Sequence, residues 1–320
     1  MQRLLIAMYH YVRDLKNSRY PDIKGLDYKL FKEQIDFFSR NFHVVTMEEV
    51  IAARNGSFLL PDKALLLTFD DGYIDHYTFV MPVLLEYGMQ GSFFIPGKAF
   101  VESTLLDVNK VHFILASSKS DTLLKDVLSQ LNYYRGSEYD IPSNEDLLNE
   151  YAIANRFDNK ETVFVKRILQ TAIPEELRRI ISSNLFSKYI GGITESQFAK
   201  ELYLNYDQIK CMKKNGMHIG IHGYDHYWLG NLPEDMMKRD IERALEVFDG
   251  IVDVNSWVMN YPYGSYNNAV TSYLSQTGCK LGLTTEVRCA DLEVDKPYQI
   301  PRLDTNDFPP KSMNYIQHLL

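Results

Sequence analysis

The chain has 320 residues, 45% of them hydrophobic, with a net charge of −8 and a pI near 5.5. This length suits one large α/β domain or two ordinary ones, and the acidic balance argues against nucleic acid as the main partner, because phosphate binding needs clustered Lys and Arg. No stretch reaches the ~18 consecutive apolar residues of a membrane span. Three scattered cysteines and a first apolar run without a secretory cleavage site predict a cytoplasmic protein with reduced thiols.

Strand-like and helix-like segments alternate along most of the chain. Before residue 100 we expect strands over 4–10, 43–46, 64–69 and 91–97, with helices over 28–40, after Thr46, and over 76–88. Thr46 and Glu49 form a capping box at the start of the second of these helices. After residue 200 we expect helices over 206–215, 233–249 and 268–277 and strands over 217–221, 256–262 and 281–285. Repeated strand–helix units predict a mostly parallel sheet or barrel covered by helices.

Residues 103–201 interrupt this alternation. The stretches 123–134, 161–172 and 175–186 have apolar residues at helical spacing, and no convincing strand lies between them. The range is therefore predicted to be an α-helical insertion into the α/β domain.

Two adjacent carboxylates end the strand predicted in LLLTFDDGY, residues 65–73. Neighbouring carboxylates repel, and burying even one is unfavourable by several kcal/mol unless it is paired or bound to a metal. A solvated turn would also account for Asp70, Asp71 and the glycine that follows, since Asp and Gly are common in turns. These nine residues alone leave both interpretations open.

A second cluster of polar residues lies in MHIGIHGYDHYWLG, residues 217–230. His222 and His226 are four residues apart at the end of a predicted strand, so both imidazoles can face one ion, and imidazole with carboxylate suits zinc or a similar divalent metal. His218 fits a structural position within the strand. Because α/β barrels gather their active sites at the carboxyl ends of the strands, the histidines and the Asp70–Asp71 pair are expected to meet there.

These motifs occur in the order in which metal-dependent polysaccharide deacetylases carry theirs, together with GSFFI, NYPYG and the spacing from Asp75 to Leu84. The sequence thus resembles this NodB-like family (carbohydrate esterase family 4) over about 1–102 and 202–305. The resemblance implies a deformed (β/α) barrel formed by 1–102 and 202–320, with 103–201 inserted. It also implies a hydrolase that removes an N-acetyl or other N-acyl group from an amino sugar. The first apolar run without a cleavage site favours a role of this hydrolase in surface polysaccharide biosynthesis.

The resemblance assigns roles to individual residues. Asp71, His222 and His226 match the ligands of one divalent metal ion, with zinc expected first and Ni, Co or Mn as alternatives, and Asp70 matches the general base. One carboxylate would thus be neutralised by the cation while the other takes a proton from a water whose pKa a metal lowers from ~15.7 to ~7. Tyr263, after the proline of NYPYG, matches the residue whose backbone N–H supports the oxyanion.

Two positions depart from the family pattern. The arginine that tethers the base is replaced by Asn260, and Arg302 in IPRLD is expected either to substitute for it from a neighbouring strand end or to be a structural ion-pair partner. The late histidine that acts as general acid has no good match, because His318 lies near the end of the chain in a helical pattern. His10, at the end of the first predicted strand, is expected to be the acid, with a structural histidine as the alternative.

Other functions and roles stay open at this point. The same fold could deformylate a sugar or hydrolyse another non-peptide C–N bond, whereas a non-catalytic carbohydrate-binding relative would have lost the base or a ligand. The substrate is expected to be a nucleotide- or lipid-linked amino sugar or an oligosaccharide. The insertion could cover the mouth of the site as a lid, join subunits of a homo-oligomer, or be a simple outgrowth.

Overall fold

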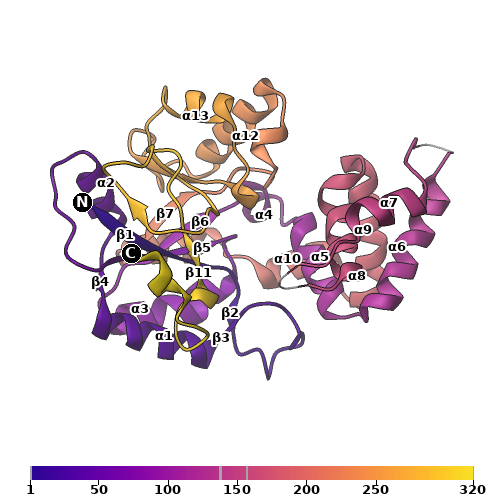
Figure 1. The fold of residues 1–320 in the computed structure, drawn as a ribbon, viewed down its shortest axis with the longest axis horizontal. Coiled ribbons are helices and arrows are strands. Elements are labelled where there is room, and N and C mark those ends of the chain that lie inside the picture. Colours follow the sequence, from indigo (N-terminus) through magenta and orange to yellow (C-terminus); the bar gives the residue numbers. More distant parts are fainter. Residues whose placement is uncertain (1, 137–138, 156–157, 320) are drawn as a thin grey trace. The chain divides into compact units, whose positions relative to one another are not determined.

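A computed structural model describes residues 2–136, 139–155 and 158–319, which form two compact units (Figure 1). The first unit comprises Met1–Asp14, Gly25–Thr104 and Ala199–Leu320, and the second comprises Leu15–Lys24 and Leu105–Phe198. The second unit therefore includes a segment, Leu15–Lys24, that falls within the range predicted for the barrel.

Within the described ranges, nine strands of the first unit form one sheet in the order β10-β1-β5-β6-β7-β8-β9, with β4 beside β5 and β11 beside β1. Neighbouring strands are parallel except β10, which is antiparallel to β1. A bridge joins Leu283 to Ile300, and β11 begins three residues later, so the sheet curls toward closure. The predicted α/β class with a barrel-like sheet is confirmed.

The strands of this sheet are β1 (Arg3–Tyr9), β4 (His43–Val44), β5 (Ala64–Asp70), β6 (Ser92–Ile95), β7 (His218–Ile221), β8 (Trp257–Asn260), β9 (Cys279–Leu283), β10 (Ala290–Asp291) and β11 (Leu303–Asp304). A separate pair of strands is formed by β2 (Val12–Arg13) and β3 (Leu26–Asp27).

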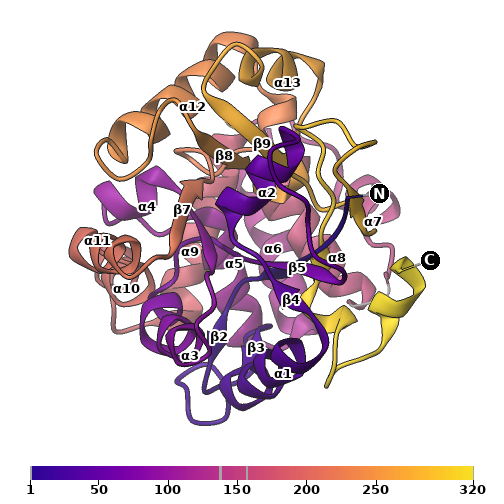
Figure 2. The same cartoon turned by 90° about the vertical axis from the view of Figure 1, so that its left-hand side faces the viewer.

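Helices of the first unit surround these strands, as Figure 2 shows for α1, α3, α12 and α13. The Asp27 side chain caps α1 by accepting the N–H of Lys29, and the predicted capping box of Thr46 and Glu49 begins α2. The predicted helix over 76–88 is a π-helical turn, η1 (His76–Val80), followed by α3. The helices are α1 (Tyr28–Asn41), α2 (Met47–Arg54), α3 (Met81–Glu86), α4 (Gly97–Val101), α11 (Tyr206–Lys214), α12 (Glu234–Val247) and α13 (Asn268–Leu274).

The two faces of the sheet have separate apolar cores. Leu5 and Ala7 of β1 belong to a larger core shared with α1, α3 and α12, whereas Leu4 and Ile6 belong to a smaller one. Alternation along the strand produces this division. The smaller core also contains Leu283 of β9, which is far from β1 in strand order, so it lies on the concave side of the sheet.

The second unit is helical in its described residues. Its longer segment comprises α5 (Asp107–Ala116), α6 (Ser120–Tyr134), α7 (Asn144–Tyr151), α8 (Lys160–Arg167), a π-helical turn η2 (Ile168–Ala172) and α9 (Glu175–Ile190), and the chain leaves through α10 (Glu195–Leu202). Tyr20, from the shorter segment, packs edge-on against Phe113 with ring centroids 5.0 Å apart. Across the part of the chain that the structure describes, no helix combines the length and the apolar character needed to cross a bilayer.

Candidate active site

Strand alternation brings several polar residues to the concave side of the sheet at its carboxyl end. Leu66 lies in the smaller core, and Asp70 lies four residues further along β5, on the same side. The same alternation of side chains places three more residues on this side of the sheet: His10 just after β1, His222 just after β7 and Asn260 at the end of β8. The fold thus gathers these side chains where parallel α/β sheets carry their active sites.

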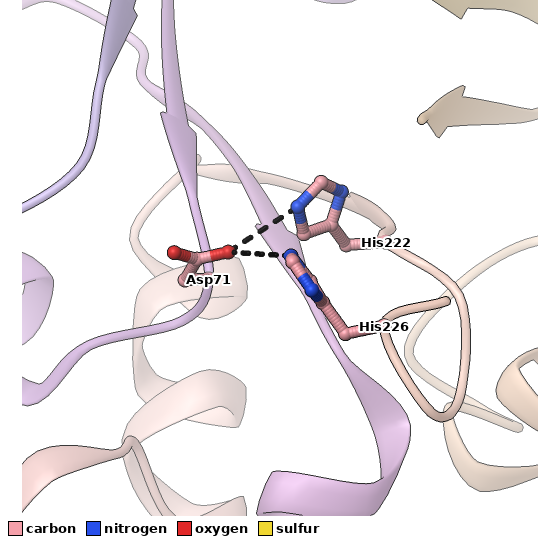
Figure 3. Close-up of side chains that lie close together, drawn as sticks. All are labelled: Asp71, His222 and His226. Atoms are coloured by element: carbon pink, nitrogen blue, oxygen red, sulfur yellow. Dashed lines mark ion pairs between the residues drawn. The ribbon is translucent and has the colours of Figure 1, made fainter. Parts of the chain in front are cut away.

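Asp71, His222 and His226 converge at this edge (Figure 3). Oδ1 of Asp71 lies 3.3 Å from Nε2 of His222 and 3.2 Å from Nε2 of His226. All three side chains are buried, and one ligand atom from each lies within 4.8 Å of the others. The structure therefore brings together the three residues that the sequence singled out as metal ligands.

The protonation of His222 shows what this group can bind. Its Nδ1 lies 2.7 Å from the carbonyl oxygen of Asn260, and because a carbonyl only accepts, Nδ1 carries the proton. In the neutral ring Nε2 then points a lone pair at Asp71, whose buried Oδ1 has no hydrogen-bond partner among the described residues. The Nε2 atoms of two imidazoles and one carboxylate oxygen thus gather at one point, and such a set of donor atoms fits a divalent cation such as zinc.

The electrostatics agree with such a site. Burial alone would raise the pKa of Asp71, but the neighbouring imidazoles of His222 and His226 outweigh it and hold this pKa well below its usual range. Burial lowers the pKa of His226, which favours the neutral imidazole that binds metals.

Asp70 is held by Arg302 and Asn260. The guanidinium of Arg302 binds both carboxylate oxygens, with N–O distances of 2.8 and 2.9 Å, and Nδ2 of Asn260 donates to Oδ1 at 2.6 Å. Burial alone would raise the pKa of Asp70, but the charge of Arg302 outweighs it, so this pKa is lowered. The carboxylate is therefore ionised and fixed in orientation. Arg302 contacts Asp70 directly, which agrees both with the substituting role and with a structural ion pair, and Asn260 contacts the same carboxylate.

His10 lies at the edge of this group. Its Nε2 is 3.8 Å from Oδ2 of Asp70, and 40% of its side chain is exposed, against 3% for Asp70. An imidazole that is both near the buried carboxylate and open to solvent is suited to proton exchange with a bound substrate.

Tyr263 lies beside the histidines in a strained turn. Its φ is 58°, and Asp71 and His226 also have left-handed backbones, with φ of 74° and 58°. The ring of Tyr263 stacks on Trp228, with centroids 4.4 Å apart, and meets the His226 ring edge-on at 4.8 Å. Strained conformations of this kind cluster at functional sites.

Two supporting residues were not predicted from the sequence. Tyr73 donates a hydrogen bond from its hydroxyl to Oδ2 of Asp71 at 2.5 Å; burial and the nearby carboxylate raise its pKa, so the phenol keeps its proton. Asp240, on α12, accepts the backbone N–H groups of Tyr224 and Asp225, at 2.9 and 2.8 Å, between the two histidines. Tyr73 could have been considered because it lies two residues after Asp71, whereas no sequence signal relates Asp240 to the loop.

Comparison with known proteins adds the family context. Residues 60–131 and 149–282, more than half of the chain, match the sequence model of the polysaccharide deacetylase family. The match includes much of 103–201, where no resemblance was predicted, and does not include His10 or Arg302. The chain is 20% identical over 285 residues to YxkH of Bacillus subtilis (strain 168), which is itself assigned to the polysaccharide deacetylases, and the match spans 89% of this chain and 65% of that protein.

Solved structures share the fold over nearly the whole chain. The deacetylase PplD of Streptococcus pyogenes, in complex with acetate, has a TM-score of 0.58 at 17% identity, covering 99% of this chain and 98% of that one. IcaB from Ammonifex degensii has a TM-score of 0.55 at 18% identity, covering 99% and 96%. This likeness supports the predicted fold class.

Proposed function

This chain belongs to the polysaccharide deacetylase family, and on that premise we propose that it is a metal-dependent N-deacetylase acting on an amino sugar. The family implies hydrolysis of an amide bond in a polysaccharide substrate. The proposal rests above all on the convergence of three buried side chains, Asp71, His222 and His226, next to the ionised carboxylate of Asp70.

Asp71, His222 and His226 would hold one divalent cation, with zinc first and nickel, cobalt or manganese as alternatives. When bound, such a cation supplies a Lewis acid that lowers the pKa of a water molecule and polarises an acyl carbonyl. His222 would offer Nε2, because its Nδ1 is fixed by the carbonyl of Asn260.

The remaining residues would move protons and stabilise charge. Asp70 accepts a proton from the attacking water, whose oxygen bonds to the acyl carbon, while Arg302 keeps Asp70 oriented. The backbone N–H of Tyr263 stabilises the oxyanion that forms. His10 donates a proton to the sugar nitrogen as the C–N bond breaks, so acetate and the free amino sugar leave.

The test is release of acetate from a panel of N-acetylated UDP-sugars and N-acetylglucosamine oligomers, with matching formylated substrates. We expect release that a chelator abolishes and one of the four divalent metals restores. Asp70→Asn should keep the metal but lose ~10²–10⁴-fold in rate, because an amide cannot take the proton. Asp295→Asn is the matched control, since Asp295 is another largely buried carboxylate bound by an arginine, Arg288.

Each outcome separates the candidate functions. Full activity after complete metal removal would contradict metal dependence, and full metal content in Asp71→Ala, His222→Ala or His226→Ala would remove that residue from the site. Formate release alone would identify a deformylase, and sugar binding without hydrolysis a non-catalytic relative. The cytoplasmic location stays a prediction, to be tested by cell fractionation.

A further inference from the structure

The two carboxylate oxygens of Asp71 have different partners. Oδ1 faces Nε2 of His222 and His226, at 3.3 and 3.2 Å, whereas Oδ2 accepts the hydroxyl of Tyr73 at 2.5 Å. Figure 3 shows the second oxygen turned away from both histidines. Oδ1 of Asp71 therefore faces both histidines, whereas Oδ2 is occupied by the hydrogen bond from the Tyr73 phenol.

The phenol of Tyr73 is itself held firmly. Its residue is fully buried, and its ring stacks on Tyr11, with centroids 4.0 Å apart and planes 17° from parallel. The preceding Gly72 has φ of +64°, and a Cβ there would lie 2.7 Å from Cγ2 of Ile95. The Gly72 carbonyl also accepts the N–H of Leu204 at 2.9 Å. Backbone and ring therefore fix where the hydroxyl can point.

A fixed donor at one carboxylate oxygen limits rotation of the whole group. Hydrogen bonds to ligating carboxylates and histidines orient them, and their loss typically weakens metal affinity by ~10–100-fold. We propose that Tyr73 is a positioning residue that engages Oδ2 of Asp71 and thereby reserves Oδ1 for the cation held with His222 and His226. This inference rests on the metal site of the proposed function.

The different partners of the two Asp71 oxygens also affect which cation the site prefers. Calcium takes many oxygen ligands and often binds both oxygens of one carboxylate, whereas zinc has a lower coordination number and needs few ligands. With Oδ2 engaged by Tyr73, Asp71 offers a single oxygen. Removing the hydroxyl should therefore weaken zinc binding more than calcium binding.

The test measures metal affinity directly, without turnover. Metal-free wild type, Tyr73→Phe and Tyr298→Phe are titrated with Zn²⁺ in competition with a chromophoric chelator, and with Ca²⁺ by calorimetry. Tyr298→Phe is the matched control, because its hydroxyl donates to the carbonyl of Cys279, at 3.3 Å, outside the site. We expect Tyr73→Phe to bind zinc ~10–100-fold more weakly and the control to match wild type.

The possible outcomes test the role of Tyr73 separately from the proposed metal site. Wild type that binds no divalent metal would overturn the proposed metal site, whereas equal zinc affinity in wild type and Tyr73→Phe would overturn only the role of Tyr73. If Tyr73→Phe does not fold, a crystal structure of zinc-loaded wild type decides. Zinc nearest Oδ1 with the Tyr73–Oδ2 bond intact supports the proposal, and both oxygens on zinc contradict it.

Discussion

Around the candidate site, Asp71, His226 and Tyr263 have left-handed backbones, and each such conformation is unfavourable by ~1–3 kcal/mol in a non-glycine residue. Neighbouring contacts offset this strain. The carboxylate of Asp240 binds two N–H groups in the turn before His226, and the ring of Tyr263 stacks on Trp228. The site residues are thus held in place by contacts that have no part in the proposed chemistry.

The Asp70–Arg302 pair makes the sharpest prediction at the level of single residues. Both side chains are almost fully buried, at 3% and 0% exposed, so Arg302→Met would leave a buried carboxylate without its counter-ion. We expect the free energy of unfolding of the metal-free protein to fall by ~3–5 kcal/mol in urea denaturation. Adding Asp70→Asn should recover much of the loss, because no unpaired charge then remains.

A surface arginine provides the control for this prediction. Arg40 binds Asp36 with both side chains exposed, at 73% and 39%, and Arg40→Met should change stability by ~1 kcal/mol or less. Equal losses at Arg40 and Arg302 would show that burial of the Asp70 pair does not matter.

Among secondary-structure elements, those with strong local signals were predictable from sequence. The apolar spacing predicted a helix over 28–40, and α1 spans Tyr28–Asn41; the Thr46 box begins α2. β10 and β11 have two residues each and carry no periodicity. Their pairing with β1 depends on contacts far along the chain, as does the bond from Arg302 to Asp70, 232 residues apart. The motifs therefore pointed to the three buried side chains that converge and to Asp70 beside them, whereas the contacts that orient these side chains depend on packing between distant parts of the chain.

The ion pairs of Asp158, in the loop before α8, should make the stability of the second unit depend on pH. Asp158 binds Lys166 at 2.7 Å and also pairs with Lys24; burial alone would raise its pKa, but the two lysines outweigh it and lower this pKa. The folded state thus favours the ionised form, and the resulting stability is present at neutral pH and lost as the pH falls through the usual aspartate value of ~3.9 toward the lower folded one.

Asp158→Asn should therefore destabilise the second unit by ~1–3 kcal/mol at pH 7, and the difference from wild type should shrink as the pH drops below ~4. Thermal unfolding across this range measures it. Asp121→Asn, at an exposed position in α6, is the control and should stay within ~0.5 kcal/mol of wild type. A difference that does not change with pH would contradict the ionic origin.

On the scale of the whole molecule, the chain enters the second unit twice. Leu15–Lys24 joins Leu105–Phe198, with Tyr20 packed on Phe113 and Lys24 paired with Asp158. The residues of the candidate metal site all belong to the first unit, which has its own cores. Metal binding should therefore not depend on the helical unit, but a deletion that removes only the longer segment would strip Tyr20 and Lys24 of these partners.

This organisation decides how a role for the insertion should be tested. We expect replacement of both 15–24 and 105–198 by short Gly/Ser linkers to preserve zinc affinity, whereas deletion of 105–198 alone should lower solubility by exposing Tyr20. If the unit acts as a lid, the double replacement should hydrolyse long and short N-acetylated oligomers with less discrimination than wild type. If it joins subunits, light scattering should show a smaller particle while the preference for substrate length stays unchanged. Loss of zinc binding from the double replacement would instead mean that the metal site needs the helical unit, contrary to its placement within the first.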